Sequence, residues 1–214
     1  MLRNASRSNR GMTLIELVVA VTVIALLLLS AAPNIGAWMQ NTQVRNTASS
    51  ILAGLNRARS ESMRRARPIR FQLVSLTNPK VMDASCALSG SGVSWVVSVN
   101  DPTSYCQYAP SLVATNANDP MIVESKAGGV GGQTMNVSAR IADGSAAASV
   151  VTFNAFGQVA DAVPIDHITV SNVIAGGDYR TLRVEIGAGG TVRLCDMGVT
   201  NTTDSRYCPT RAIP

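Results

Sequence analysis

The sequence G-M-T-L-I-E-L at residues 11–17 joins a basic stub to a long apolar run that ends at Ala32. From Met12 to Ala32 there are 21 residues, and a helix rising about 1.5 Å per residue then covers roughly 30 Å, the thickness of a bilayer core. One acid, Glu16, stands at the head of the run. A charged carboxylate near a bilayer core costs roughly 2.5–3.5 kcal/mol. The acid therefore indicates a charged partner and a specific task.

The same stretch resembles the class III leader of type IV pilins and type II secretion pseudopilins. In that family a prepilin peptidase cuts after the glycine and methylates the new amino terminus, which implies cleavage after Gly11 and methylation of Met12. Glu16 is the fifth residue counted from Met12, as in the family. The resemblance implies that Glu16 pairs with the terminal ammonium of a neighbouring subunit, since opposite charges attract strongly in a low dielectric. Met12 departs from the usual pattern, in which phenylalanine is commoner.

Two simpler interpretations of residues 11–32 stay open. The run fits an ordinary membrane anchor, and Ser30-Ala31-Ala32 is similar to a secretory cleavage site. Glu16 argues against both, because neither needs an acid in its apolar segment.

Pro33 lacks a backbone donor and is predicted to kink or loosen the helix. In the pilin family a proline here marks a bend and a region that can melt on assembly.

Charge and cysteine content predict where the chain resides. The 18 basic and 13 acidic residues give a formal charge of +5, and loss of the three leader arginines leaves 15 against 13, or +2. The leader arginines are predicted to stay in the cytoplasm under the positive-inside rule, so that the domain after residue 33 faces the periplasm. The expected location is thus the inner membrane, with a single crossing, and then a pilus or pseudopilus filament.

The four cysteines are an even number, which suits an oxidising compartment. There is no C-x-x-C spacing, so neither a zinc site nor a thioredoxin-like site is predicted. Three pairings are open, and the local one is favoured: Cys86 with Cys106, and Cys195 with Cys208. The second bridge closes a loop of about 14 residues, worth roughly 3 kcal/mol in the chain-entropy model.

The rest of the chain predicts an amphipathic helix followed by strands. Residues 33–67 carry apolar side chains at helical spacing, and Pro68 ends the helix; the stripe is Val44, Ala48, Ile51, Leu52, Leu55, Ala58 and Met63. Short β-rich runs follow at 69–76, 95–99, 121–124, 135–141, 150–154, 158–160, 168–173, 181–186 and 191–194. The glycine-rich stretch 128–132 lacks a following Lys-Ser/Thr and is predicted to be a flexible turn, not a phosphate loop.

Three segments narrow the resemblance to GspH/FimT-type minor pilins. They are the helix end at 55–68, the F-x-x-x-G turn at 153–157, and the last strand with its tail at 181–208. Residues 77–147 show no resemblance. The resemblance implies an α+β, type IV pilin-like fold, in which a long N-terminal helix packs on an antiparallel β-sheet domain. The expected organisation is a cleaved leader at 1–11, a transmembrane and assembly helix at 12–32, an amphipathic helix at 33–67 and a periplasmic domain at 68–214.

The sequence contains no catalytic or metal-binding pattern. His167 is the single histidine and is interpreted as a surface or hydrogen-bonded residue, and neither G-x-S-x-G nor H-E-x-x-H occurs. Asp143, Asp161 and Asp166 lie near turn residues, where aspartate commonly caps the backbone. We therefore expect no enzyme, no cofactor and no metal.

Arginines gather at the helix end, between Arg57 and Arg70. Cations at a helix carboxyl end are favoured by the macrodipole, and Arg57 with Glu61 forms an i,i+4 pair. A structural role is thus favoured over a surface for an acidic partner.

The favoured function is that of a minor pilin or pseudopilin that joins the initiating or tip complex of a filament. Its expected partners are the prepilin peptidase, other pilins and the inner membrane. The alternative is a minor pilin that binds DNA during uptake, as FimT-type proteins do with a G-R-x-R motif. Here Thr191 replaces the first arginine and only Arg193 carries over, with Arg206 and Arg211 as further candidate contacts. The sequence does not separate type IV pili from type II secretion, because the two share the domain.

Overall fold

The computed structural model describes residues 12–111, 113–174 and 179–209, without the side chains of residues 29–35, 130 and 131. The chain forms two compact units, residues 1–39 and 40–214. Helix α1, Leu14–Arg65, supplies the described part of the first unit and continues into the second. The helix is not interrupted at Pro33. The predicted kink there stays a prediction.

Helix α1 begins with a capping box. The Thr13 hydroxyl accepts a hydrogen bond from the Glu16 N–H at 3.3 Å, and the Glu16 carboxylate accepts one from the Thr13 N–H at 3.4 Å. This reciprocal pair satisfies two N–H groups that a helix start otherwise leaves open. It places the start of the helix at Leu14, two residues after the predicted start at Met12.

The apolar side chains that the structure describes in the first unit are almost all exposed. Leu14, Ile15 and Leu26 are 83%, 71% and 68% exposed, and the other large apolar residues between 17 and 28 are also exposed. Among the side chains that the structure describes, which leave out 29–35, no helix is long and apolar enough to cross a membrane.

The second half of α1 buries one stripe. Val44, Ala48, Ile51, Leu55 and Ala58 are all fully buried, as the helical spacing predicted. Met63 was wrongly assigned to this stripe. It is 46% exposed, because the sequence of the last turns presents Glu61 and Ser62 to the interior instead.

The helix ends two residues earlier than predicted, at Arg65. Ala66 takes a left-handed conformation with φ of 49°, and the Arg67 N–H donates to the Ser62 carbonyl at 3.2 Å. This 6→1 bond is that of a Schellman cap, with alanine where glycine is usual. The chain then turns directly into the first strand.

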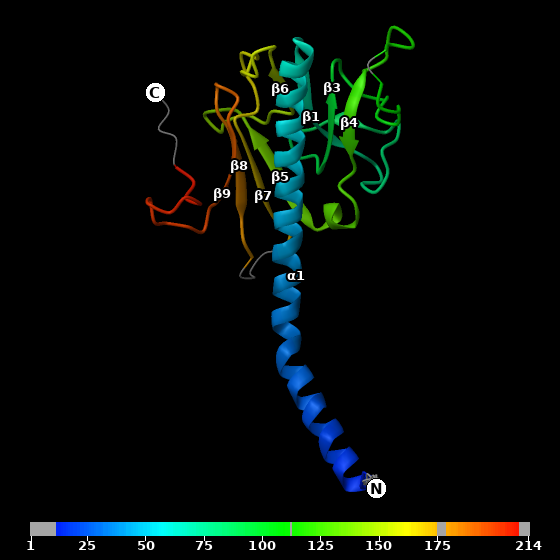
Figure 1. Cartoon of the computed structure of the whole chain (residues 1–214), viewed down its shortest axis with the longest axis vertical. Coiled ribbons are helices and arrows are strands. Elements are labelled where there is room, and N and C mark those ends of the chain that lie inside the picture. Colours follow the sequence, from blue (N-terminus) through cyan, green and yellow to red (C-terminus); the bar gives the residue numbers. More distant parts are fainter. Residues whose placement is uncertain (1–11, 112, 175–178, 210–214) are drawn as a thin grey trace, which may run out of the picture. The chain divides into compact units, whose positions relative to one another are not determined.

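Two antiparallel sheets follow (Figure 1). The first has the order β2-β1-β3-β4, with β6 also pairing with β1; its strands are β1 Ile69–Ser75, β2 Ala87–Leu88, β3 Ser94–Ser98, β4 Ile122–Lys126 and β6 Val150–Phe153. The second has the order β5-β7-β8-β9; its strands are β5 Met135–Arg140, β7 His167–Asn172, β8 Leu182–Ile186 and β9 Val192–Asp196.

Most of the predicted strands are confirmed within a few residues. The run 158–160 is not a strand, since Val159 forms only an isolated bridge with Phe153. Strand β2 was not predicted. The glycine-rich stretch contains a short 3₁₀ helix, η1, at Val130–Gln133, and the flexibility expected of this turn stays a prediction.

One core joins α1 to both sheets. The helix stripe shares a buried cluster with Phe71 and Leu73 of the first sheet and with Val137 and Val184 of the second. In Figure 1 the second half of α1 runs between the two sets of strands. A smaller cluster lies on the other face of the first sheet and comprises Val74, Cys86, Val96, Cys106 and Ile122.

Both disulfides have the local connectivity favoured above. Cys86–Cys106 bridges the loops on either side of β3, with Cα atoms 6.2 Å apart. Cys195–Cys208 fastens the tail to β9, with Cα atoms 5.1 Å apart.

Candidate functional site

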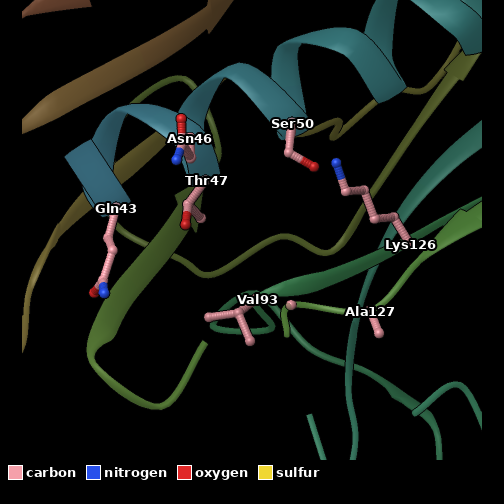
Figure 2. A pocket seen from close by; sticks show the side chains of 8 residues that line it. Gln43, Asn46, Thr47, Ser50, Val93, Lys126 and Ala127 are labelled. Carbon is pink, nitrogen blue, oxygen red and sulfur yellow. The ribbon is translucent and has the colours of Figure 1, made fainter. Parts of the chain in front are cut away.

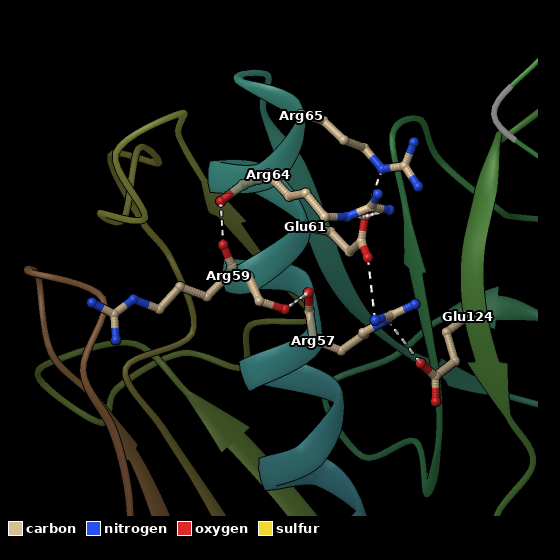
Figure 3. Close-up of polar contacts among 8 residues, drawn as sticks. Arg57, Arg59, Glu61, Arg64, Arg65 and Glu124 are labelled. Carbon is tan, nitrogen blue, oxygen red and sulfur yellow. Dashed lines mark hydrogen bonds and ion pairs between the residues drawn. The ribbon is translucent and has the colours of Figure 1, made fainter.

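The arginine-rich end of α1 is organised around a buried carboxylate. Glu61 is only 2% exposed, and three guanidinium groups surround it (Figure 3). Its oxygens lie 3.2 Å from Arg57 Nη1, 2.6 Å from Arg64 Nη2 and 2.6 Å from Arg65 Nε. The predicted i,i+4 pair of Arg57 with Glu61 is thus confirmed, within a larger group.

The surrounding arginines keep Glu61 ionised. Burial opposes its ionisation, but hydrogen bonds from Arg64 and Arg65 and the charge of Arg57 outweigh burial and hold the pKa of Glu61 below 4.5. Arg57 also contacts Glu124 of β4, with its Nε 3.2 Å from Oε2. The cluster therefore ties the last turns of the helix to the first sheet.

Arg59 ties the helix to the F-x-x-x-G turn. Its Nε donates to the Gly157 carbonyl at 3.2 Å. Gly157 and Gly190 both have positive φ, 74° and 77°, and a Cβ on Gly190 would collide with the Gly157 carbonyl. Glycine is needed at 190 for both reasons. The arginines at 57, 59, 64 and 65 thus hold the helix end in place, which favours the structural interpretation.

The candidate DNA contacts are already paired with acids where the structure describes them. Arg193 Nε lies 2.8 Å from Glu185 Oε2, and Arg206 Nη2 lies 2.8 Å from Asp204 Oδ2. Hydrogen bonds from the side chain and the backbone N–H of Arg206 hold the pKa of Asp204 at about 2. Arg211 lies outside the described residues. These pairs leave Arg193 and Arg206 with little net charge for a phosphate backbone.

A polar groove of about 220 Å³ lies beside α1 in the second unit (Figure 2). The helix supplies Gln43, Asn46, Thr47 and Ser50, and the opposite wall is Val93, Lys126, Ala127 and Gly128. Ser50 already accepts a hydrogen bond from Trp95 Nε1 at 3.0 Å. The groove contains neither a nucleophile paired with a base nor a group of metal ligands.

One cluster in the described part of the chain has the composition of a metal site, but not its chemistry. Glu185, Cys195 and Cys208 bring ligand atoms within 4.8 Å of one another. Both sulfurs are joined in the disulfide, so neither is a thiolate, the form that binds metal. His167 interacts with Asp166 through Nδ1 at 3.2 Å.

Sequence reasoning missed Gly54 and the extent of the Glu61 cluster. A Cβ at Gly54 would lie 2.8 Å from the Phe71 ring and 3.0 Å from the Trp95 ring. No sequence pattern marks that approach. The arginines at 64 and 65, three and four residues after Glu61, were the available signal for the cluster.

The amino-terminal residues match a known motif. Residues 6–32 match the model of the prokaryotic N-terminal methylation motif. A helix that starts within this motif and packs its second half on antiparallel sheets defines the pilin-like class of filament subunits.

The chain belongs to the family of the type II transport protein GspH, whose model matches residues 47–190. This match includes residues 77–147, for which the sequence had shown no resemblance. The chain is thus a minor pilin of the type IV pilus and type II secretion type, in a family of structural subunits.

Two crystal structures of the type IV minor pilin FimU from Pseudomonas aeruginosa are similar to the chain. The first has 16% identity and a TM-score of 0.42, over 73% of this chain and 91% of FimU. The second has 17% identity and a TM-score of 0.39, over 70% and 90%. No curated protein matches the chain.

Proposed function

We propose that this minor pilin acts in the initiating or tip complex of its filament, and that Glu16 pairs with the terminal ammonium of a neighbouring subunit. The observation that carries the proposal is the contrast between the two units. Residues 40–214 contain both core clusters and both disulfides, whereas the apolar side chains between 14 and 28 are exposed. Exposed apolar surface of this extent needs a partner or a membrane to cover it.

The proposal includes the path to the filament. Prepilin peptidase cleaves after Gly11 and methylates Met12, the helix holds the subunit in the inner membrane, and the domain faces the periplasm. The two disulfides support an oxidising compartment for the domain. Other pilins or pseudopilins then bind the helix, and because the family spans both systems, the proposal covers either kind of filament.

The test separates the charge of Glu16 from its role in the helix cap. Glu16→Gln keeps the amide oxygen that a capping box can use but removes the charge. Thr13→Ala removes the cap and keeps the charge. The amount of each variant in sheared filaments, relative to its amount in cells, reports assembly.

We expect Glu16→Gln to lower incorporation about tenfold, which corresponds to losing about 1.4 kcal/mol of pairing energy. Thr13→Ala should stay within about twofold. Incorporation of Glu16→Gln at the parent level, with intact disulfides in every variant, would show that the charge is not needed.

A further inference from the structure

The outer face of the second sheet carries a row of charged side chains. Antiparallel register places Arg140 opposite His167, and Thr169 opposite Arg183, on strands β5, β7 and β8. The alternate residues on these strands, such as Ile168 and Val184, are buried in the core, so this row faces away from it. Adjacent strands lie about 4.8 Å apart, and Arg140 and Arg183 therefore flank the middle strand.

Other charges on this face are compensated. Glu185 pairs with Arg193 at 2.8 Å, and Asp166 lies 3.2 Å from His167 Nδ1. Arg140 Nε donates only to the Ser138 hydroxyl, at 3.2 Å.

Arg183 is the exception in the described part of the chain. Its Nε is buried and has no hydrogen-bond partner. A buried donor without an acceptor is unfavourable, and a guanidinium remains charged under all ordinary conditions. The Nε–H of Arg183 is therefore an unmatched buried donor.

The His167 imidazole lies on the strand between the two arginines, and their positive charges affect its pKa. Burial lowers the pKa of His167 below 6.5, and the positive charges of Arg183 and Arg140 lower it further, while Glu185 opposes them. At the imidazole, the two arginines thus outweigh Glu185.

We propose that this face binds an oxyanion of the phosphate class over His167 and Thr169. Arg183 donates from one side, Arg140 donates from the other, and the Thr169 hydroxyl donates from the strand between them. Guanidinium groups and hydroxyls are the usual donors to phosphate oxygens. The ligand is either free phosphate or the phosphodiester of a lipid head group.

His167 provides the readout, because it is the only histidine in the chain. The probe is inorganic phosphate, titrated into the full-length mature protein in detergent micelles while the His167 ring is followed by NMR. A bound anion favours the imidazolium, so it should raise the pKa of His167 and move its signals saturably. Nanodiscs of phosphatidylglycerol, compared with phosphatidylcholine, test the lipid source.

Arg183→Gln should weaken phosphate binding about tenfold, the loss expected for a charge-assisted hydrogen bond. Arg140→Gln should weaken it too. Arg70→Gln is the matched control, since Arg70 is an exposed arginine on β1 of the other sheet, and it should change nothing.

Two results would overturn the site: no saturable shift with either phosphate or phosphatidylglycerol, or equal shifts in parent, Arg183→Gln and Arg140→Gln. Disulfide mapping and circular dichroism verify that the variants are folded. A shift with phosphate alone identifies the free anion as the ligand, and a shift with phosphatidylglycerol alone identifies the lipid head group.

Discussion

Glu61 shows how one side chain can be both buried and charged. A carboxylate taken out of water is stable only when its lone pairs and charge are matched. Here the match comes from three arginines within four residues along the same helix, and no distant segment is required. The sequence R-A-R-S-E-S-M-R-R at residues 57–65 therefore builds its own ion cluster as soon as the helix forms.

This arrangement predicts a pH-dependent stability. The pKa of Glu61 is lower in the folded chain than its ordinary 4.5, so its contribution is present above about pH 4.5 and is lost as the pH falls through the folded value. Glu61→Gln should lower the free energy of unfolding at pH 7 by about 2 kcal/mol. Below the folded pKa the parent and the variant should converge. Denaturant unfolding at pH 7 and at pH 3 measures both effects.

Glu124→Gln is the control for the Glu61 prediction. Glu124 is 48% exposed and pairs with Arg57 alone, so its loss should change stability by less than about 1 kcal/mol at either pH. If the free energies of unfolding of the parent and Glu61→Gln differ by the same amount at pH 7 and at pH 3, the charge of Glu61 does not contribute to stability.

At the scale of elements, α1 can pack closely against β3 because Gly54 has no side chain. Gly54 lets the helix approach the Phe71 and Trp95 rings, whose centroids lie 5.9 Å apart. Trp95 then reaches Ser50, one turn earlier on the helix. Glycine in a helix interior normally lowers stability by about 0.5–1 kcal/mol relative to alanine. At position 54 glycine is needed because it allows this close packing.

Gly54→Ala should therefore destabilise the protein, although alanine is the better helix former. The added methyl would lie 2.8 Å from a fully buried ring, and overpacking of this kind costs about 1–3 kcal/mol. Gly36→Ala in the same helix meets nothing within 4 Å and should be neutral or slightly stabilising. Thermal unfolding of the two variants compares them directly. A higher melting temperature for Gly54→Ala than for the parent would contradict the packing argument.

The elements themselves could be predicted from sequence because each follows a local period. The helix stripe from Val44 to Ala58 and the alternation of residues 183–186 fix which face is buried without reference to any other segment. The local cysteine pairing followed from the short separation within each pair. Strand β2 was missed because a two-residue strand has no period to detect.

The features that the sequence analysis did not predict all depend on contacts between segments that lie far apart in the chain. Met63 fits the helical spacing, but the core ends one turn earlier and leaves it at the surface. The lack of a hydrogen-bond partner for Arg183 Nε depends on which strands become neighbours. The sequence does not encode that in any short window, and the same holds for the close approach at Gly54.

At the scale of the whole molecule, the first testable event is processing. Cleavage after Gly11 should remove residues 1–11 and lower the formal charge by three, because Arg3, Arg7 and Arg10 are lost. We expect a mature chain that begins with N-methylated Met12 in cells with a prepilin peptidase, and a chain that keeps residues 1–11 in cells without one. Intact-mass measurement distinguishes the two. A mature start at Pro33 would instead indicate a secretory signal.

The burial of one helical stripe against both sheets also has a mechanical consequence. In the filament proposed above, tension would act on this subunit through its amino-terminal helix and would reach residues 40–214 through the second half of α1. From Val44 to Ala58 that load is shared by side chains in contact with two sheets, and at the end of the helix by the Glu61 cluster and the Arg59 bond to Gly157. Many weak contacts loaded side by side must shear together before the helix can slide. The second half of α1 is thus held against sliding by contacts along its buried length.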